Sequence, residues 1–228
     1  MNDEIIFQKQ RYDLVQTLIN KGIKDRFVLK AIGNVPRHEF MMPIFRARAY
    51  EDSAMRIDEE QTISQPYTVA YQSQLLKVEK GDRILEIGTG SGYQACVLAE
   101  MGAKVFSIER IRKLYSKSKK LIQKLCYFKV ETKYGDGFEG WPEKAAFDKI
   151  IVTAAAPNIP KELVKQLKVG GFLIIPCDRP GQNQEMLKVN KLSESEYTVE
   201  ELGSFSFVPM LEGVESGSRY EHYSKRKR

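Results

Sequence analysis

The chain has 228 residues, a formal net charge of +6, and 42% hydrophobic and 29% charged residues. These values are typical of one soluble globular domain, and they exclude a transmembrane protein because no apolar run approaches the ~20 residues of a membrane helix. Three widely spaced cysteines, Cys96, Cys126 and Cys177, indicate a reducing, cytoplasmic compartment rather than a disulfide framework or a metal clamp, and we expect all three to be buried and inert.

The first 75 residues are predicted to form helices and loops. A first helix is indicated by residues that recur at helix spacing opposite a polar face, namely Phe7, Arg11, Leu14, Val15, Leu18 and Ile19. A second, short helix is expected near residues 24–35, with Asp25 close to its start. The acidic N-terminus lacks the continuous apolar core of a secretory signal.

A polar segment at residues 61–67, QTISQPY, shows neither strand alternation nor a helical period. Its proline, Pro66, restricts Gln65 to extended geometry. Such a segment is either a plain connection or part of a site, and its composition alone leaves both interpretations open.

From Arg83 onward, short apolar runs alternate with helix-length segments. The runs are RILEIG, KVFSIER, FKVETKY, FDKIIVTAA and GFLIIP. This alternation predicts a doubly wound, mostly parallel α/β sheet with helices on both faces. The glycines of KVGG (168–171) are expected at the end of the helix before the last run. Near the C-terminus, we expect further antiparallel strands at a sheet edge, from EMLKVNK, EYTVEEL and SFSFVPML.

We expect a single domain over residues 1–228. In this domain, residues 1–75 would cover the site, 76–190 would form the ligand-binding core, 191–220 would add strands, and 221–228 would be a basic tail. The last four residues are all basic, and subtracting their charges leaves only about +2 for the rest of the chain. We therefore interpret the tail as a solubilising end.

The first apolar run leads into a glycine-rich turn. Gly88, Gly90 and Gly92 alternate between a strand ending near Glu86 and the start of a helix. Glycines permit a tight turn and the close approach of a ligand, at the strand ends where open α/β sheets bind ligands. The spacing differs from the G-x-G-x-x-G of dinucleotide sites, and the Glu86 carboxylate would repel a pyrophosphate but suits a cationic ligand. S-adenosylmethionine, which carries an ammonium and a sulfonium and no phosphate, is such a ligand.

Two later strand ends carry acidic residues that suit the same cofactor. Glu109 can accept hydrogen bonds from both ribose hydroxyls, and Asp136 can accept one from the exocyclic adenine amine, while Gly137 keeps the backbone accessible. Alternatively, Glu109 caps a helix and Asp136–Gly137 is only a turn. The recurrence of such features at successive strand ends favours the cofactor.

Six motifs resemble, in this order, those of the protein-L-isoaspartate O-methyltransferase family: VPRHEF, QTISQPY, EIGTGSGYQ, YGDG, VTAAAPNIP and LKVGGFLIIP. The resemblance spans roughly residues 35–210, and TISQP together with AAAP distinguishes this family from other methyltransferases. It implies methylation of the free α-carboxylate of isoaspartyl residues in damaged proteins and peptides, with S-adenosylmethionine as methyl donor. The ester would then cyclise to a succinimide, which hydrolyses partly to ordinary aspartate.

The resemblance also implies roles for individual residues. Ser64 would lie beside the methyl donor, contact the substrate carboxylate and be the catalytic residue, with Pro66 stiffening the end of its segment. The cofactor-binding residues would be Ile63, Glu86, Gly88, Thr89, Gly90, Ser91, Gly92, Glu109, Arg110, Asp136, Gly137 and Thr153. The substrate-binding residues would be Thr62, Ile63, Gln65, Ala154, Ala155, Ala156, Pro157, Val208 and Leu211. Without the resemblance, Ser64 could equally be a turn hydroxyl or a helix cap, and the alanines a plain connection.

Displacement at a methyl carbon by a carboxylate needs no general base, because a carboxyl group with a pKa near ~3.5 is ionised at neutral pH. We therefore expect Ser64 to orient one carboxylate oxygen rather than to activate it, and we expect no metal. Of the two histidines, His38 is expected to be structural and His222 lies near the basic tail.

Two other functions stay open. One is a methyltransferase acting on RNA or a small molecule, which the positive charge favours slightly but which leaves TISQP unexplained. The other is a non-catalytic module that binds an adenosine ligand, against which the intact glycines, the strand-end acids and Ser64 argue. The expected partners are isoaspartyl proteins and peptides, with neither membrane nor nucleic acid as a partner, and the expected state is a monomer.

Overall fold

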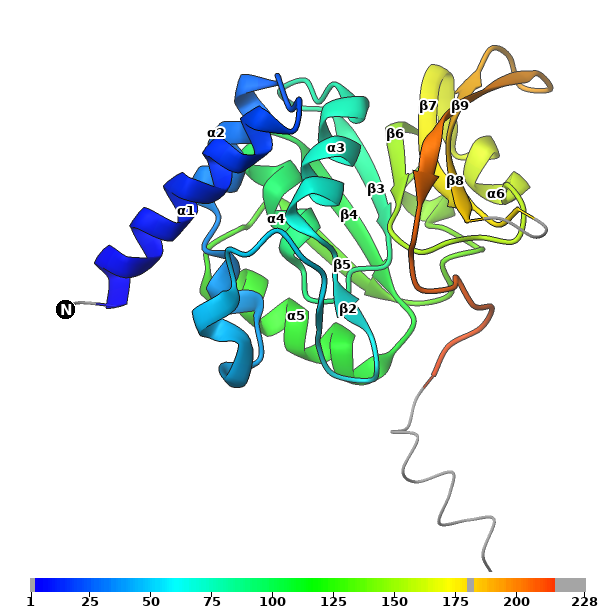
Figure 1. Ribbon diagram of the computed structural model, residues 1–228. Coiled ribbons are helices and arrows are strands. Elements are labelled where there is room, and N and C mark those ends of the chain that lie inside the picture. The colour runs from blue at the N-terminus through cyan, green and yellow to red at the C-terminus, as the bar shows by residue number, and fades with distance from the viewer. Residues whose placement is uncertain (1–2, 180–182, 216–228) are drawn as a thin grey trace, which may run out of the picture.

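A seven-stranded sheet runs through the computed structural model, which describes residues 3–179 and 183–215 (Figure 1). Its strands are β3 (Arg83–Ile87), β4 (Lys104–Glu109), β5 (Val130–Tyr134), β6 (Phe147–Val152), β7 (Leu167–Cys177), β8 (Gln184–Lys191) and β9 (Tyr197–Phe205). Their order in the sheet is β5-β4-β3-β6-β7-β8-β9. The first five are parallel, and β8 and β9 are added antiparallel at one edge. The predicted doubly wound, mostly parallel sheet with extra C-terminal strands is confirmed.

Helices lie on both faces of this sheet. The helices of the described residues are α1 (Asp3–Asn20), α2 (Arg26–Asn34), α3 (Pro66–Leu76), α4 (Tyr93–Glu100), α5 (Arg112–Lys124) and α6 (Lys161–Lys165). Successive residues of a strand point to opposite faces, so that Ile84 packs in one cluster with Leu98 of α4, whereas Leu85 packs in another with Leu163 of α6. The first two helices pack outside α3 and α4, away from the sheet (Figure 1). No helix within the two described ranges is both long and apolar enough to cross a membrane.

The N-terminal helices form where the sequence predicts them. Asp25 caps α2, because its carboxylate accepts hydrogen bonds from the backbone N–H groups of Phe27 and Val28 at 2.8 and 3.3 Å. Leu18 of α1 is fully buried, whereas Ile19, which the periodicity assigns to the same apolar face, is 43% exposed. The buried stripe of α1 is therefore narrower than predicted.

Short elements that the sequence does not reveal connect α2 to α3. Two 3₁₀-helices, η1 (Arg37–Phe40) and η2 (Pro43–Arg48), are followed by two-residue strands, β1 (Met55–Arg56) and β2 (Thr62–Ile63), which pair antiparallel. Pro66 does not merely stiffen the loop after β2, since it occupies the first turn of α3, where its missing N–H costs no hydrogen bond.

Three other predictions about the chain are wrong in detail. The helix before β7 has only five residues, so the glycines of KVGG lie inside β7 rather than at a helix end. A Cβ at Gly171 would lie 2.6 Å from the carbonyl oxygen of Asp148, and this glycine therefore lets β7 approach β6 closely. The segment after Phe205 is not a strand. Cys126 is exposed, whereas Cys96 and Cys177 are buried as expected.

Candidate active site

The strand order reverses at β3, because the next strand in the chain, β4, lies on one side of it and β6 on the other. Open α/β sheets bind ligands at such a switch point, beyond the carboxyl ends of the strands. Here Ile87 at the end of β3 pairs with Ile108 of β4 and Val152 of β6. The residues after these three positions therefore converge on one place.

Gly88, the first residue of the glycine turn, is in contact with Thr153, which follows β6. The Thr153 hydroxyl lies 3.0 and 2.8 Å from the carbonyl oxygens of Ile87 and Gly88. Gly88 has φ +98°, and a Cβ there would lie 2.6 Å from that hydroxyl. A glycine is required because both the backbone conformation and the close threonine exclude a side chain.

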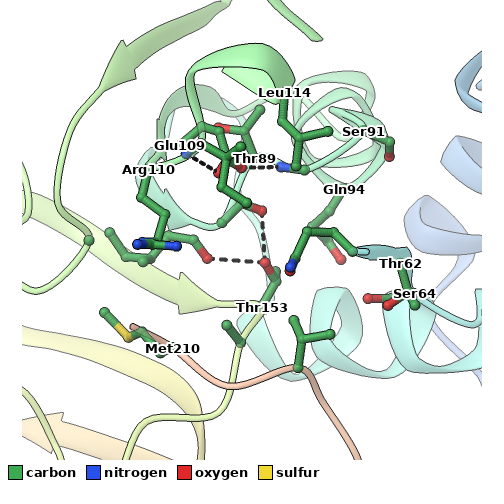
Figure 2. Close-up of a pocket in the computed structure, with 18 of the residues that line it drawn as sticks. Thr62, Ser64, Thr89, Ser91, Gln94, Glu109, Arg110, Leu114, Thr153 and Met210 are labelled. Carbon is green, nitrogen blue, oxygen red and sulfur yellow. Dashed lines mark hydrogen bonds between the residues drawn. The ribbon is translucent and has the colours of Figure 1, made fainter. Parts of the chain in front are cut away.

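A cavity of about 300 Å³ opens at this switch point. Thr62 and Ser64 lie on one side of it and Arg110 on the other (Figure 2). The predicted site residues that line it are Thr62, Ile63, Ser64, Gly88, Thr89, Gly90, Ser91, Glu109, Arg110, Gly137, Thr153, Ala154, Val208 and Leu211. Segments far apart in the chain thus meet in one hollow of a size that suits a small molecule.

Further lining residues escape sequence reasoning. They are Glu60, Gln61, Val69, Ile87, Tyr93, Gln94, Ile108, Ile111, Leu114, Pro209 and Met210. Several are neighbours of predicted site residues, as Ile108 is of Glu109, and Gln61, Ile87 and Tyr93 lie inside the QTISQPY and EIGTGSGYQ motifs without an assigned role. Gln94 ends the EIGTGSGYQ motif, but its residue type and spacing predict no role for it.

Glu86 does not line the cavity, contrary to the expectation of direct ligand contact. Its carboxylate is fully buried and accepts a hydrogen bond from the Ser107 hydroxyl, which in turn lies 2.5 Å from the Thr89 hydroxyl of the glycine turn. Burial raises the pKa of Glu86 to about 8, with the charge of Glu109 acting in the same direction and the Ser107 hydrogen bond opposing both. Glu86 therefore supports the glycine turn through Ser107 and Thr89 instead of contacting a ligand.

Glu109, at the end of β4, lines the cavity while only 4% exposed. One carboxylate oxygen accepts the N–H of Gly90 and the other the N–H of Ile111, each at 2.8 Å (Figure 2). Burial raises the pKa of Glu109, and the backbone hydrogen bonds oppose this shift. Each oxygen keeps a free lone pair, so the same carboxylate can brace the loop and accept a ligand hydroxyl.

Asp136 lies beside the cavity rather than in its wall, whereas Gly137 lines it. The two carboxylate oxygens of Asp136 accept the N–H groups of Phe138 at 2.8 Å and Gly213 at 2.6 Å. The turn that the sequence left as an alternative is thus present. Gly213 also accepts a hydrogen bond from Arg110 Nε at 3.1 Å, which fastens the C-terminal segment across this side of the site.

The alanine loop after β6 is less open than predicted. Ala155 and Ala156 are buried, and Ala155 exchanges backbone hydrogen bonds with Val208 and Met210. Ala156 pairs in the same way with Pro176 and Asp178. Of the predicted substrate residues in this loop only Ala154 lines the cavity, since Pro157 is exposed outside it. Pairing with distant segments thus occupies the backbone of Ala155 and Ala156, two of the predicted substrate-binding residues.

The remaining predicted residues lie just outside the cavity wall. Gln65 donates a hydrogen bond through Nε2 to the Asp52 carbonyl at 3.0 Å, so it anchors the Ser64 segment instead of facing a ligand. Gly92, with φ +91°, is the N-cap residue directly before α4, and a Cβ there would lie 3.0 Å from Ile122 of α5.

His38 has the structural role expected of it. Its ring stacks on Phe7 with 4.0 Å between centroids, and Nδ1 lies 2.7 Å from the Tyr50 hydroxyl. Burial lowers the pKa of His38. His222 and the basic tail lie outside the described residues. Within those residues, no group of three or more His, Cys, Asp or Glu side chains is placed to hold a metal ion.

Residues 9–215 match the family described as protein-L-isoaspartate(D-aspartate) O-methyltransferase (PCMT). The chain is 52% identical to the protein-L-isoaspartate O-methyltransferase of Christiangramia forsetii, over 93% of this chain and 99% of that one. It is 49% identical to the Cytophaga hutchinsonii protein of the same name, over 92% and 95%.

Two solved structures share the fold over nearly the whole chain. One is a protein-L-isoaspartate O-methyltransferase with a TM-score of 0.80 and 29% identity, covering 94% of this chain and 69% of that one. Another is a protein described as a beta-aspartate methyltransferase of Plasmodium falciparum in complex with S-adenosyl-L-homocysteine. Its TM-score is 0.76 and its identity 26%, with 87% of this chain and 97% of that one covered.

The raised pKa of Glu86 predicts how stability changes with pH. Between about pH 4.5 and 8 the folded chain holds a proton on Glu86 that the unfolded chain releases, so this group's contribution to stability falls as pH rises. Glu86→Gln is uncharged in both states and loses this term. We therefore expect the difference in unfolding free energy, variant minus wild type, to increase by up to about 1.4 kcal/mol for each pH unit by which the pH is raised.

Urea unfolding of both proteins at pH 5, 6, 7 and 8 measures this difference. Glu143→Gln, at a carboxylate that is 72% exposed, is the matched control and should follow the wild-type pH dependence. Parallel curves for wild type and Glu86→Gln would show that the buried carboxyl is not protonated at neutral pH.

Proposed function

Because the chain belongs to the protein-L-isoaspartate O-methyltransferase family, we propose that it transfers the methyl group of S-adenosylmethionine to the free α-carboxylate of L-isoaspartyl residues in damaged proteins and peptides. The observation that carries this proposal is one cavity lined by the glycine turn, by Glu109 and by Ser64. It thus joins a place for an adenosine ligand to the segment that the family resemblance assigns to the substrate. The ester formed would start repair by closing to a succinimide.

The cavity suits S-adenosylmethionine in its donors, acceptors and charge. Gln94 lines it, and Oε1 of this side chain is buried without a hydrogen-bond partner among the described residues, as an ammonium group would require. Glu109 offers an acceptor on each oxygen for ribose hydroxyls. The charged residues of the lining are Glu60, Glu109 and Arg110, which together carry one net negative charge and complement a cationic ligand.

When bound, S-adenosylmethionine supplies an electrophilic methyl group. The isoaspartyl carboxylate is already ionised at neutral pH, so no side chain has to remove a proton and no metal is needed. Strong hydrogen bonds to this carboxylate would stabilise the ground state more than the transition state, in which the two charges neutralise each other. Ser64 therefore orients one oxygen, and the walls of the cavity exclude water and align the reactants, an effect that reaches roughly 7–11 kcal/mol in model systems.

The proposal also includes the organisation and location predicted from sequence. The N-terminal part would serve as a cover, which is supported by the presence of Gln61, Thr62, Ile63 and Ser64 in the cavity wall. The reducing environment of the cytoplasm is supported by Cys96, which is a free thiol. A monomer is part of the same proposal.

Methyl transfer to a matched pair of peptides tests the function. We expect label from tritiated S-adenosylmethionine to appear as a base-labile ester on a peptide with one isoaspartyl residue, and not on the same peptide with aspartate. At the position that differs, the α-carboxylate is free only in the isoaspartyl peptide, because in the aspartyl peptide it forms the peptide bond. Equal labelling of both, or labelling of neither with S-adenosylhomocysteine still bound, would contradict the proposal and direct the search to RNA and small molecules.

Replacing Ser64 tests its orienting role. A hydrogen bond to a charged group contributes about 1.5–3 kcal/mol, so Ser64→Ala should lose roughly ten- to a hundredfold in kcat/KM. The Kd for S-adenosylhomocysteine should stay close to the wild-type value. Ser116→Ala, on the exposed side of α5, is the matched control and should keep full activity. Complete loss of activity in Ser64→Ala, with the cofactor product still bound, would assign the hydroxyl more than orientation.

The loop between β1 and β2 forms part of this cover and is held down by ion pairs. Glu59 lies 2.7 Å from Lys113 Nζ and Asp58 lies 2.7 Å from Lys117 Nζ, and both lysines belong to α5. Glu59 and Glu60 both have φ +57°, a conformation that costs non-glycine residues about 1–3 kcal/mol each. Contacts from outside the loop must offset this strain, and the two lysines provide them.

Removal of both lysines should therefore loosen the cover. Exposed ion pairs contribute about 0.2–1 kcal/mol each, so loss of both pairs in Lys113→Ala/Lys117→Ala should release S-adenosylhomocysteine roughly two- to thirtyfold faster. The difference from wild type should shrink in high salt. Stopped-flow dissociation measures this rate. Lys119→Ala/Lys120→Ala removes the same charge from the same helix, without an ion pair among the described residues, and equal acceleration in both variants would contradict the prediction.

A further inference from the structure

Arg37, in η1, is a fully buried arginine directly behind the Ser64 segment. Its Nη2 donates a hydrogen bond to the Ser64 carbonyl at 2.9 Å, and its Nε donates one to the Ala49 carbonyl, also at 2.9 Å. Nη1 has no hydrogen-bond partner in the described part of the chain. One planar guanidinium thus connects two loops that approach the site from different directions.

Arg37 also contacts a residue of the cavity wall directly after the glycine turn. The guanidinium carbon lies 4.9 Å from the centre of the Tyr93 ring, a distance typical of a cation–π contact. Tyr93 is the first residue of α4, immediately after the glycine turn, and it lines the cavity. Phe40, from the same 3₁₀-helix as Arg37, packs edge-on against this ring at 5.5 Å. The side chain therefore touches both halves of the site.

This arrangement is costly for stability alone. Within residues 3–179 and 183–215 no carboxylate forms a salt bridge with Arg37, and burying an unpaired charge is unfavourable by several kcal/mol unless hydrogen bonds compensate for it. An apolar side chain could fill the same volume without that penalty, but it could not donate to two carbonyl groups at fixed angles.

We propose that Arg37 is a positioning residue for methyl transfer, which fixes the backbone of Ser64 relative to the glycine turn. The carbonyl that it holds belongs to the residue whose hydroxyl would orient the substrate carboxylate, and Tyr93 fixes the distance from that carbonyl to the cofactor side. Among the described residues, the neighbouring Gln65 side chain donates hydrogen bonds only to Asp52. This inference rests on the proposed function, and it adds a residue that touches neither substrate nor cofactor.

A double-mutant cycle tests whether Arg37 acts through Ser64. The proteins are wild type, Arg37→Lys, Ser64→Ala and the double variant, assayed on an isoaspartyl peptide with saturating S-adenosylmethionine. A lysine reaches one carbonyl but not two, so we expect kcat to fall roughly tenfold, with peptide KM and the Kd of S-adenosylhomocysteine each within about threefold of wild type. In the Ser64→Ala background the same change should cost less than about threefold, because the hydroxyl to be positioned is gone. Equal losses in both backgrounds would overturn the proposal.

Hydrogen–deuterium exchange provides a readout that does not depend on activity. With S-adenosylhomocysteine bound, Arg37→Lys and Arg37→Gln should speed exchange of the amides at residues 61–65 and leave those of β3 and β4 unchanged. Arg48→Lys, at an exposed arginine paired with Glu51, is the matched control and should change neither region. Unchanged exchange at residues 61–65 in both Arg37 variants would overturn the proposal. If wild type methylates no isoaspartyl peptide, the proposed function fails, and the exchange result still decides whether Arg37 holds this segment.

Discussion

The contact between Gly88 and Thr153 is the constraint on which the site depends. It lies where β3 and β6, which pair directly, end at the reversal of the strand order, and a Cβ at Gly88 would lie 2.6 Å from the threonine hydroxyl. The contact joins the segments that follow these two strands, and the residues that follow β3, β4 and β6 face one cavity rather than three separate surfaces. The glycine turn can then present its backbone to a ligand without a side chain in between.

Two buried carboxylates at this position do different work. Glu109 is exposed to the cavity and braced by two backbone N–H groups, which leaves its oxygens available to a ligand. Glu86 is one strand away and fully enclosed, where a hydroxyl from Ser107 is its partner. Environment rather than residue type separates their roles: burial raises the pKa of both groups, and backbone N–H donors oppose this shift at Glu109, whereas a single side-chain hydroxyl opposes it at Glu86.

The N-terminal part completes the cavity through polar contacts rather than apolar packing alone. Arg37 holds the Ser64 backbone from behind, while ion pairs from α5 hold the strained loop between β1 and β2 from the front. The contact between Arg37 and the Ser64 carbonyl is buried, and Arg37 also reaches the residue after the glycine turn, Tyr93. The ion pairs are exposed and sensitive to salt. For the proposed function, the buried Arg37 contact would keep the Ser64 segment in place for a substrate. The exposed ion pairs of α5 would let the loop between β1 and β2 open for a cofactor.

The sequence by itself determined the alternation of strands and helices, the glycine turn and the chemical class of the ligand, because apolar runs and glycine spacing act over a few residues. The family resemblance pointed to Ser64 and the strand-end position to Glu109, and both residues line the cavity. The tertiary structure alone decided that Glu86 faces the interior and that Ala155 is paired with the C-terminal segment. It also placed Arg37 against the Ser64 carbonyl, a contact that the VPRHEF motif does not reveal. In each case the deciding partner is far away in the chain, and hydrogen bonds between distant segments leave no trace in local periodicity.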